Sequence, residues 1–143
     1  MDTPLDSPHD SPHDSTAARP VARTASTRLA LGRFGEDLAA DHLRACGMVI
    51  LDRNWRSRSG EVDIVARDGD VLVVCEVKTR TTAAFGHPLV AVTPIKLRRM
   101  RRLAAEWLAA RGLRVRCVRF DIVGILAPRS GSPVLEHVRG VDQ

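Results

Sequence analysis

Apolar residues recur at intervals of three and four in two stretches of the chain, a spacing that predicts two amphipathic helices. The first stretch begins at Thr27 and ends before Gly47. The second follows the N-cap pair Thr93-Pro94, runs to about Arg111 and ends at Gly112. The expected buried residues are Leu31, Phe34, Leu38, His42 and Ala45 in the first helix, and Leu97, Met100, Leu103, Ala104, Trp107 and Leu108 in the second.

Runs rich in β-branched and aliphatic residues predict strands over 48–51, 61–67, 71–80, 115–125 and 134–138. The first run ends in the polar Asp52-Arg53-Asn54, and Asp68-Gly69 predicts a two-residue hairpin turn between the second and third. The order is αβββαββ. Because a helix joins the third strand to the fourth, we expect those two strands to be parallel. The pattern therefore predicts an α/β fold with a mixed central sheet flanked by helices.

Residues 1–26 differ from the rest of the chain in composition. They repeat the sequence Asp-Ser-Pro-His and hold Leu5 and Val21 as their large aliphatic residues. So little apolar surface cannot offset the entropy lost on ordering. We expect 1–26 to be a disordered low-complexity tail, dispensable for folding and nucleic-acid binding, and 27–143 to be the folded domain. Metal binding by His9 and His13 is the less favoured reading of the tail.

The net charge of the chain indicates what kind of partner it binds. The chain has 22 Lys and Arg against 17 Asp and Glu, a net charge of +5. Four Asp and two Arg give the tail a charge of −2, which leaves +7 for the other 117 residues. A basic domain favours a polyanionic partner, in the first place DNA. No apolar run reaches the roughly 20 residues of a membrane helix, so no membrane is expected.

The three cysteines, Cys46, Cys75 and Cys117, are far apart and contain no CxxC pair. This spacing excludes a disulfide framework and a cysteine zinc knuckle, and it fits a reducing compartment. Together with the absence of an apolar leader, it predicts a cytoplasmic protein.

The candidate chemistry lies on the predicted hairpin. With Asp68-Gly69 as the turn, Arg67 pairs with Asp70, and Val65, Asp63 and Glu61 lie opposite Leu72, Val74 and Glu76. Alternation then places Glu61, Asp63, Glu76 and Lys78 on one sheet face. One interpretation is an ordinary Glu76–Lys78 ion pair on a solvated face. The other is a metal site, because several carboxylates at the end of a buried face need charge compensation.

A hard divalent cation supplies such compensation. Mg²⁺ or Mn²⁺ takes carboxylate and carbonyl oxygens, so Asp63, Glu76 and the Val77 carbonyl are the expected half-site, with Glu61 as an additional candidate. Lys78 would then stabilise the attacking hydroxide or the charge on the phosphoryl centre. The chain has 20 Arg and only two Lys, Lys78 and Lys96, which draws attention to both.

Separated motifs occur in order between Leu31 and Ile125. They are Gly35-Glu36, Arg53-Asn54-Trp55-Arg56, Gly60-Glu61-Val62-Asp63, Glu76-Val77-Lys78-Thr79-Arg80, Phe85-Gly86, Lys96 and Arg119-Phe120-Asp121. This series resembles the YraN family of bacterial proteins. The spacing of Asp63 and Glu76-Val77-Lys78 resembles the motif of the PD-(D/E)XK nuclease superfamily. Val62 stands at the position of the proline in that motif.

The resemblance implies a restriction-endonuclease-like core, related to archaeal Holliday-junction resolvases, and Mg²⁺-dependent hydrolysis of phosphodiester bonds. It also implies a role for Glu36, as a ligand of a second metal ion or of water on the metal. From the sequence alone, Glu36 reads as a solvated helix glutamate.

The second helix carries most of the expected phosphate contacts. Lys96 reads equally well as a solvated lysine or as a phosphate ligand. The nucleic-acid-binding candidates are Lys96, Arg98, Arg99, Arg102, Arg56 and Arg80. We expect His42 and His137 to be packing or surface residues, and we give His87 little weight as a general base.

These observations lead to two hypotheses. The first is a metal-dependent nuclease acting on DNA, including branched or structured DNA, with Glu36, Asp63, Glu76 and Lys78 as catalytic residues and Asp63, Glu76 and Glu36 as metal ligands. The alternative is a non-catalytic nucleic-acid-binding or adaptor protein with an endonuclease-like fold. A homodimer is left open as the oligomeric state.

Overall fold

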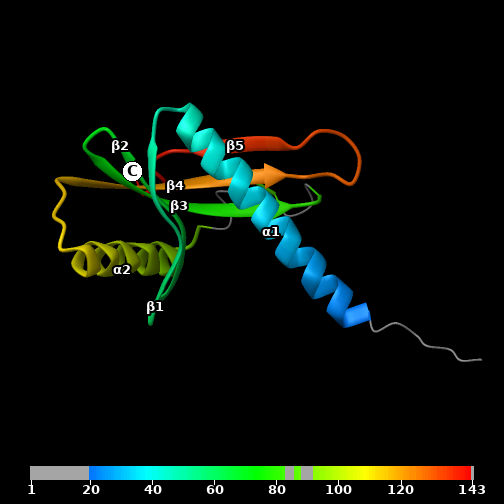
Figure 1. The fold of residues 1–143 in the computed structure, drawn as a ribbon, viewed down its shortest axis with the longest axis horizontal. Helices are drawn as coiled ribbons and strands as arrows, with labels where there is room; N and C mark the ends of the chain where they lie inside the picture. Colours follow the sequence, from blue (N-terminus) through cyan, green and yellow to red (C-terminus); the bar gives the residue numbers. More distant parts are fainter. Residues whose placement is uncertain (1–19, 83–85, 88–91, 143) are drawn as a thin grey trace, which may run out of the picture.

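The computed structural model describes residues 20–82, 86–87 and 92–142. Within these ranges the elements are α1 (Pro20–Ala45), β1 (Val49–Ser57), β2 (Gly60–Asp68), β3 (Val71–Arg80), α2 (Pro94–Arg111), β4 (Cys117–Leu126) and β5 (Val134–Val138). In this part of the chain the strands form one sheet in the order β1-β2-β3-β4-β5 (Figure 1). The β3–β4 pair is parallel, and the other neighbours are antiparallel. The predicted α/β class and the order αβββαββ, expected of an endonuclease-like core, are confirmed.

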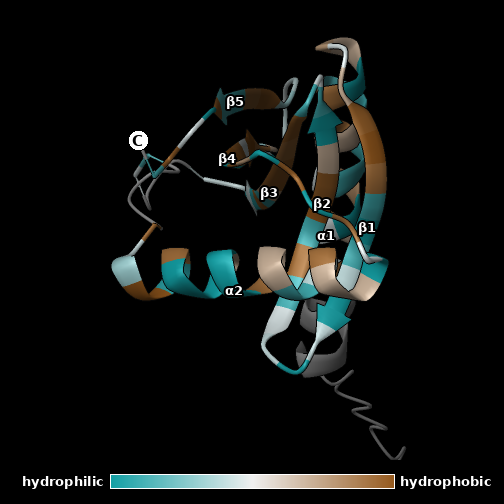
Figure 2. Ribbon diagram, turned by 90° about the vertical axis from the view of Figure 1, so that its left-hand side faces the viewer, coloured by the Kyte–Doolittle hydropathy of each residue, from teal (hydrophilic) through white to brown (hydrophobic). Residues whose placement is uncertain are grey.

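Each helix covers one face of the sheet, and strand alternation decides which side chains it meets (Figure 2). The α1 face buries Ala39, Ala40 and Leu43 of the helix against residues of β2, β3 and β4 such as Ile64 and Val73. The α2 face buries another set, which is Met100, Leu103, Ala104 and Trp107 of the helix with Val65, Leu72, Val74 and Phe120 of the strands. The predicted buried stripe of α2 is confirmed, with Leu97 and Leu108 partly buried. Thr93 also caps α2 as expected, its Oγ1 accepting a hydrogen bond from the Lys96 N–H.

The prediction of which α1 residues face the sheet is wrong: along much of the helix, the buried residue is the one that follows the predicted residue. Phe34 is 44% exposed, and the helix instead turns Gly35 and Ala39 towards the sheet. A Cβ atom built on Gly35 would lie 1.7 Å from Thr79 Oγ1, so the helix backbone approaches β3 more closely than any larger residue permits. The periodicity of large residues missed this face because small residues form the contact. α1 also begins at Pro20, seven residues before the predicted start.

The predicted hairpin register is also wrong. The turn residues are Gly69 and Asp70, and Asp68 pairs with Val71, so Val65 lies opposite Val74 rather than Leu72. Gly69 has φ +58° and stands first in the turn, the position at which a two-residue hairpin turn requires positive φ. The predicted turn would have placed Asp68 there. Because the register moves by two residues, every side chain keeps its predicted face.

β1 is longer than predicted. It continues through the polar Asp52-Arg53-Asn54 to Ser57, with a register shift between Ile50 and Asp52 and a positive φ of 52° at Asn54. Residues 1–19, with His9 and His13, lie outside the described residues, so their disorder stays a prediction. Residues 20–26, the rest of the predicted tail, are helical and belong to α1. Phe85 also lies outside the described residues. Among the described helices, none combines the length and the apolar character needed to cross a membrane.

Candidate active site

Where β2 and β3 stop pairing, a small cavity opens between the sheet and α2. The paired register of these strands ends at Ile64 and Cys75. Beyond it the Val77 N–H donates to Asp63 Oδ2 at 2.8 Å, so a side chain takes the place of a backbone partner. We call this space of about 50 Å³ the acid cavity. Its charged lining residues are Glu61, Asp63, Glu76, Lys96 and Arg99.

Asp63 is the most perturbed of these carboxyl groups. Burial raises its pKa, the hydrogen bond from the Val77 N–H lowers it, and the charges of Glu36, Glu76 and Glu61 raise it again. The balance moves the pKa of Asp63 from 3.8 to about 6. Four carboxyl groups from α1, β2 and β3 are therefore close enough to affect one ionisation, a concentration of negative charge that attracts a cation.

Glu76 also lines the acid cavity, and one of its two carboxylate oxygens is paired. Its Oε1 lies 2.5 Å from Lys96 Nζ, and both side chains are largely buried, with exposures of 20% and 15%. Its Oε2 is buried and has no hydrogen-bond partner among the described residues. A buried carboxylate oxygen without a donor is costly unless something else binds it. The oxygen donors of this cavity fit a hard divalent cation such as Mg²⁺ or Mn²⁺.

Glu36 approaches from α1. It lines a separate, wider cavity with Val77 and Thr79, and its charge still reaches Asp63. The close approach of α1 to β3 at Gly35 brings it there. Glu61 lies at the rim of the acid cavity, where its carboxylate is 3.6 Å from the Arg56 guanidinium.

Lys78 lies two residues beyond Glu76 on β3 and lines a neighbouring cavity of about 310 Å³ with Gly124, His87 and Glu136. The acid cavity is lined by Glu76 and by Lys96 of α2, and the cation paired with Glu76 is Lys96. His87 bonds to Glu136 in that neighbouring cavity, away from Asp63. The sequence signal for Lys96 was its rarity, one of two lysines among 22 basic residues.

The predicted arginines take different places. Arg99 lines the acid cavity, and its aliphatic stem lies over Gly60. Arg98 lines a different cavity near the start of α2, and Arg102 is exposed with Glu106 nearby. The side chain of Arg56 is 78% exposed, and Arg80 lines the cavities that also contain Glu36 and Lys78. Of the predicted arginines, Arg99 is thus the one placed in the acid cavity.

The Arg119-Phe120-Asp121 motif forms a buried network on β4. Asp121 is fully buried and accepts hydrogen bonds from Arg119, from His137 and from the Gly140 N–H. Burial raises the pKa of Asp121, but these hydrogen bonds outweigh it and the pKa is lowered. The motif therefore fixes a carboxylate inside the fold, on the sheet face opposite the acid cavity.

Comparisons with known proteins agree with the motif series. The model of the uncharacterised protein family UPF0102 matches residues 35–125. A UPF0102 protein of Nocardioides sp. is 58% identical over 117 residues, which are 82% of this chain and 94% of that protein. A UPF0102 protein of Acidothermus cellulolyticus is 56% identical over 130 residues, covering 84% of this chain and 98% of that protein. The similarity to the YraN group expected from the motifs is confirmed, and the chain belongs to the UPF0102 family.

Proposed function

We propose that this protein is a divalent-metal-dependent nuclease that hydrolyses phosphodiester bonds of DNA in the cytoplasm. The observation that carries the proposal is the acid cavity, where Asp63 and the unpartnered oxygen of Glu76 lie beside the cationic Lys96 and Arg99. Carboxylates that hold a cation, next to cations that hold a phosphate, form the charge pattern that phosphodiester hydrolysis needs.

In the proposed site the carboxylates hold the metal ion. Asp63 and Glu76 would hold the ion, and the Val77 N–H keeps the Asp63 carboxylate oriented. Glu36 and Glu61 add negative charge from the two sides, and Glu36 is the proposed further ligand. When bound, Mg²⁺ or Mn²⁺ supplies Lewis-acid stabilisation of the charge that builds on the phosphoryl oxygens.

The cations face the substrate in this scheme. If the ion compensates the charge of Glu76, Lys96 would leave its ion pair with Glu76 and bind a phosphate oxygen of the substrate instead. Arg99 would bind an adjacent phosphate, which positions DNA without reading its sequence. Lys78, next along the same strand, is the proposed donor to the charge that develops at the scissile phosphate.

The test is cleavage of a panel of linear, flapped and four-way-junction DNA with Mn²⁺ or Mg²⁺. We expect Asp63→Asn and Glu76→Gln to reduce the cleavage rate by at least about 10²-fold while DNA binding is retained. Asp41→Asn, the same change at an exposed position of α1, is the matched control. If the unaltered protein binds DNA but does not cleave it with either metal, the proposed nuclease activity is wrong. That result would favour the non-catalytic adaptor.

Lys78→Arg separates a catalytic lysine from a surface ion pair. The change keeps the charge, but a planar guanidinium cannot take the place of a compact ammonium. We expect cleavage to fall while DNA affinity is kept. A fully active arginine variant would remove Lys78 from the site and leave Lys96 as the lysine to test.

A further inference from the structure

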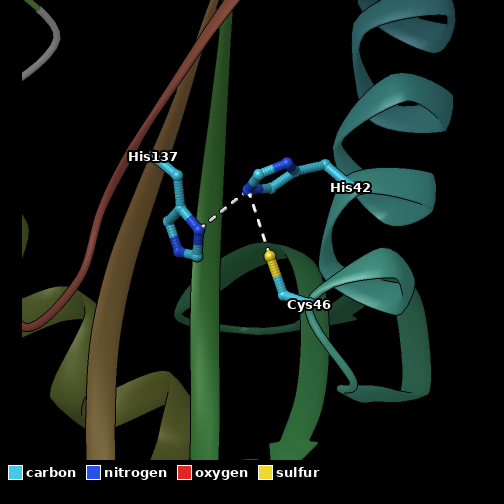
Figure 3. A group of neighbouring side chains, drawn as sticks. All are labelled: His42, Cys46 and His137. Carbon is cyan, nitrogen blue, oxygen red and sulfur yellow. Dashed lines mark hydrogen bonds between the residues drawn. The ribbon is translucent and has the colours of Figure 1, made fainter.

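A second group of side chains with metal-ligating atoms lies where the end of α1 meets β5 (Figure 3). His42 comes from the last turn of α1, Cys46 follows the helix directly, and His137 comes from β5. His42 Nε2 lies 3.1 Å from His137 Nδ1 and 3.6 Å from Cys46 Sγ. All three ligand atoms lie within 4.8 Å of one another.

These separations can be compared with those around a metal ion. A tetrahedral zinc ion with Zn–N bonds of about 2.05 Å and Zn–S bonds of about 2.3 Å separates two nitrogens by about 3.3 Å, and a nitrogen from a sulfur by about 3.6 Å. The observed distances of 3.1 and 3.6 Å match those edges closely. The third pair, Cys46 Sγ and His137 Nδ1, lies within 4.8 Å, so these side chains would have to move closer to share one ion.

A hydrogen bond to Asp121 fixes the orientation of the His137 ring. Its Nε2 lies 2.8 Å from Asp121 Oδ2, and its side chain is 7% exposed. An ionised carboxylate can only accept hydrogen bonds, so His137 Nε2 donates to Asp121 and, in the neutral imidazole, Nδ1 is the acceptor nitrogen. The Nδ1 atom then carries the lone pair and turns it towards His42 and Cys46. A carboxylate that holds the far nitrogen of a histidine is the usual support of a metal-ligating imidazole.

We propose that His42 Nε2, Cys46 Sγ and His137 Nδ1 bind a zinc ion, with water in the fourth position. Two imidazoles and a thiolate suit zinc rather than Mg²⁺ or Mn²⁺, which prefer oxygen. Cys46 is exposed, so an ion can reach the three ligands from solvent.

The site joins parts of the fold that are distant in sequence. His42 and His137 are 95 residues apart, and a shared ion would tie the end of α1 to the edge strand β5. Zinc binding then stabilises the folded state, because the unfolded chain lacks the preformed ligand set. The site shares no residue with the acid cavity, so the proposal does not depend on the proposed nuclease.

The alternative is a hydrogen-bonded group without metal, in which His42 Nε2–H donates to His137 Nδ1. The two readings differ in what Cys46 does. In a zinc site the thiolate is a ligand whose loss weakens binding. In a hydrogen-bonded group, replacing an exposed cysteine changes little.

The experiment uses the full-length, reduced protein and Zn²⁺ or Co²⁺ alone. Zn²⁺ affinity is measured by competition with a chromogenic chelator, and Co²⁺ is followed by its visible bands and its near-ultraviolet thiolate charge-transfer band. Cys46→Ser is the test variant, and Cys117→Ser, at the other exposed cysteine, is the matched control. Repeating the series in Asp63→Asn weakens any binding of the ion by the acid cavity and so separates the two sites.

We expect one Zn²⁺ per chain, a thiolate–Co²⁺ band, and a rise in melting temperature with Zn²⁺. Cys46→Ser should lose the band and weaken Zn²⁺ binding by at least about tenfold, and His42→Gln should weaken it comparably. Cys117→Ser should bind as the unaltered protein does. Equal binding by the Cys46 and Cys117 variants, the absence of a thiolate band, or no binding at micromolar Zn²⁺ would each overturn the proposal.

Discussion

At Asp63, burial and three neighbouring carboxylates act against one backbone hydrogen bond, and their balance determines how stability depends on pH. The pKa is 3.8 for an ordinary aspartate and about 6 in the folded protein, so the folded state binds this proton more tightly than the unfolded state does. The free energy of unfolding therefore falls as the pH rises from about 4 to about 6. The loss from this group alone is on the order of 3 kcal/mol.

Urea denaturation in EDTA across this pH range measures the effect. In Asp63→Asn, the free energy of unfolding should fall less between about pH 4 and about pH 6. At neutral pH this variant should be as stable as the unaltered protein, or more stable. Asp41→Asn should keep the decline, because Asp41 is exposed. If Asp63→Asn is instead several kcal/mol less stable at neutral pH, Asp63 is a structural ion-pair partner.

The Lys96–Glu76 pair gives a second prediction at this scale. Removing one partner of a buried pair leaves an uncompensated charge and typically costs about 3–5 kcal/mol. We expect Lys96→Met to lose up to that much stability without metal and to regain most of it with Mn²⁺, which takes over the compensation of Glu76. Arg98→Met, on the exposed side of α2, is the control. Denaturation curves in which Mn²⁺ helps the variant no more than the unaltered protein would contradict this.

Strand alternation could predict part of the acid cavity. It placed Glu61, Asp63 and Glu76 on one face, and a register error of two residues left that grouping intact. The Lys96 contact could not be derived in this way, because which helix side chain meets the sheet depends on how the helix is docked. Glu36 needed the family resemblance, since its approach depends on the close contact of Gly35 with Thr79.

At the scale of elements, the docking of α1 depends on one glycine. Gly35→Ala would force its Cβ against Thr79 Oγ1, and overpacking of this kind costs about 1–3 kcal/mol. Gly32→Ala, on the same helix with open space around it, should instead gain up to about 1 kcal/mol from helix propensity.

Thermal melting of the two variants checks this difference. Gly35→Ala should melt earlier than the unaltered protein and Gly32→Ala slightly later. Equal melting temperatures would mean that α1 can shift away from β3 without cost.

The two helices show why one element was easier to predict than the other. α2 buries large residues at regular intervals, so its stripe could be read from the sequence. α1 meets the sheet through Gly35, Ala39 and Ala40, which carry little hydrophobic signal, while the large Phe34 stays half exposed. The prediction of the hairpin turn was wrong for a local reason. Asp68-Gly69 and Gly69-Asp70 both have turn-forming composition, but the second pair puts glycine at the first turn position, where a positive φ is required, and the first pair would put Asp68 there.

For the whole molecule, charge predicts the effect of the N-terminal segment on DNA binding. Residues 1–19 contain four Asp and one Arg, so a variant lacking them has a net charge of +8 instead of +5. We expect its DNA affinity to be equal or somewhat higher at low salt, because fewer like charges oppose the phosphates. Its melting temperature should be unchanged, since α1 begins at Pro20. Weaker DNA binding or a much lower melting temperature would show that this segment contributes to the domain.

The acid cavity can be tested directly by calorimetric titration of Mn²⁺ into the unaltered protein, Asp63→Asn and Asp41→Asn at neutral pH. A cation site made by Asp63 and Glu76 predicts binding to the unaltered protein and to Asp41→Asn, with an affinity at least about tenfold weaker for Asp63→Asn. Equal affinities for all three proteins, or no binding by the unaltered protein at millimolar Mn²⁺, would contradict a metal site in this cavity.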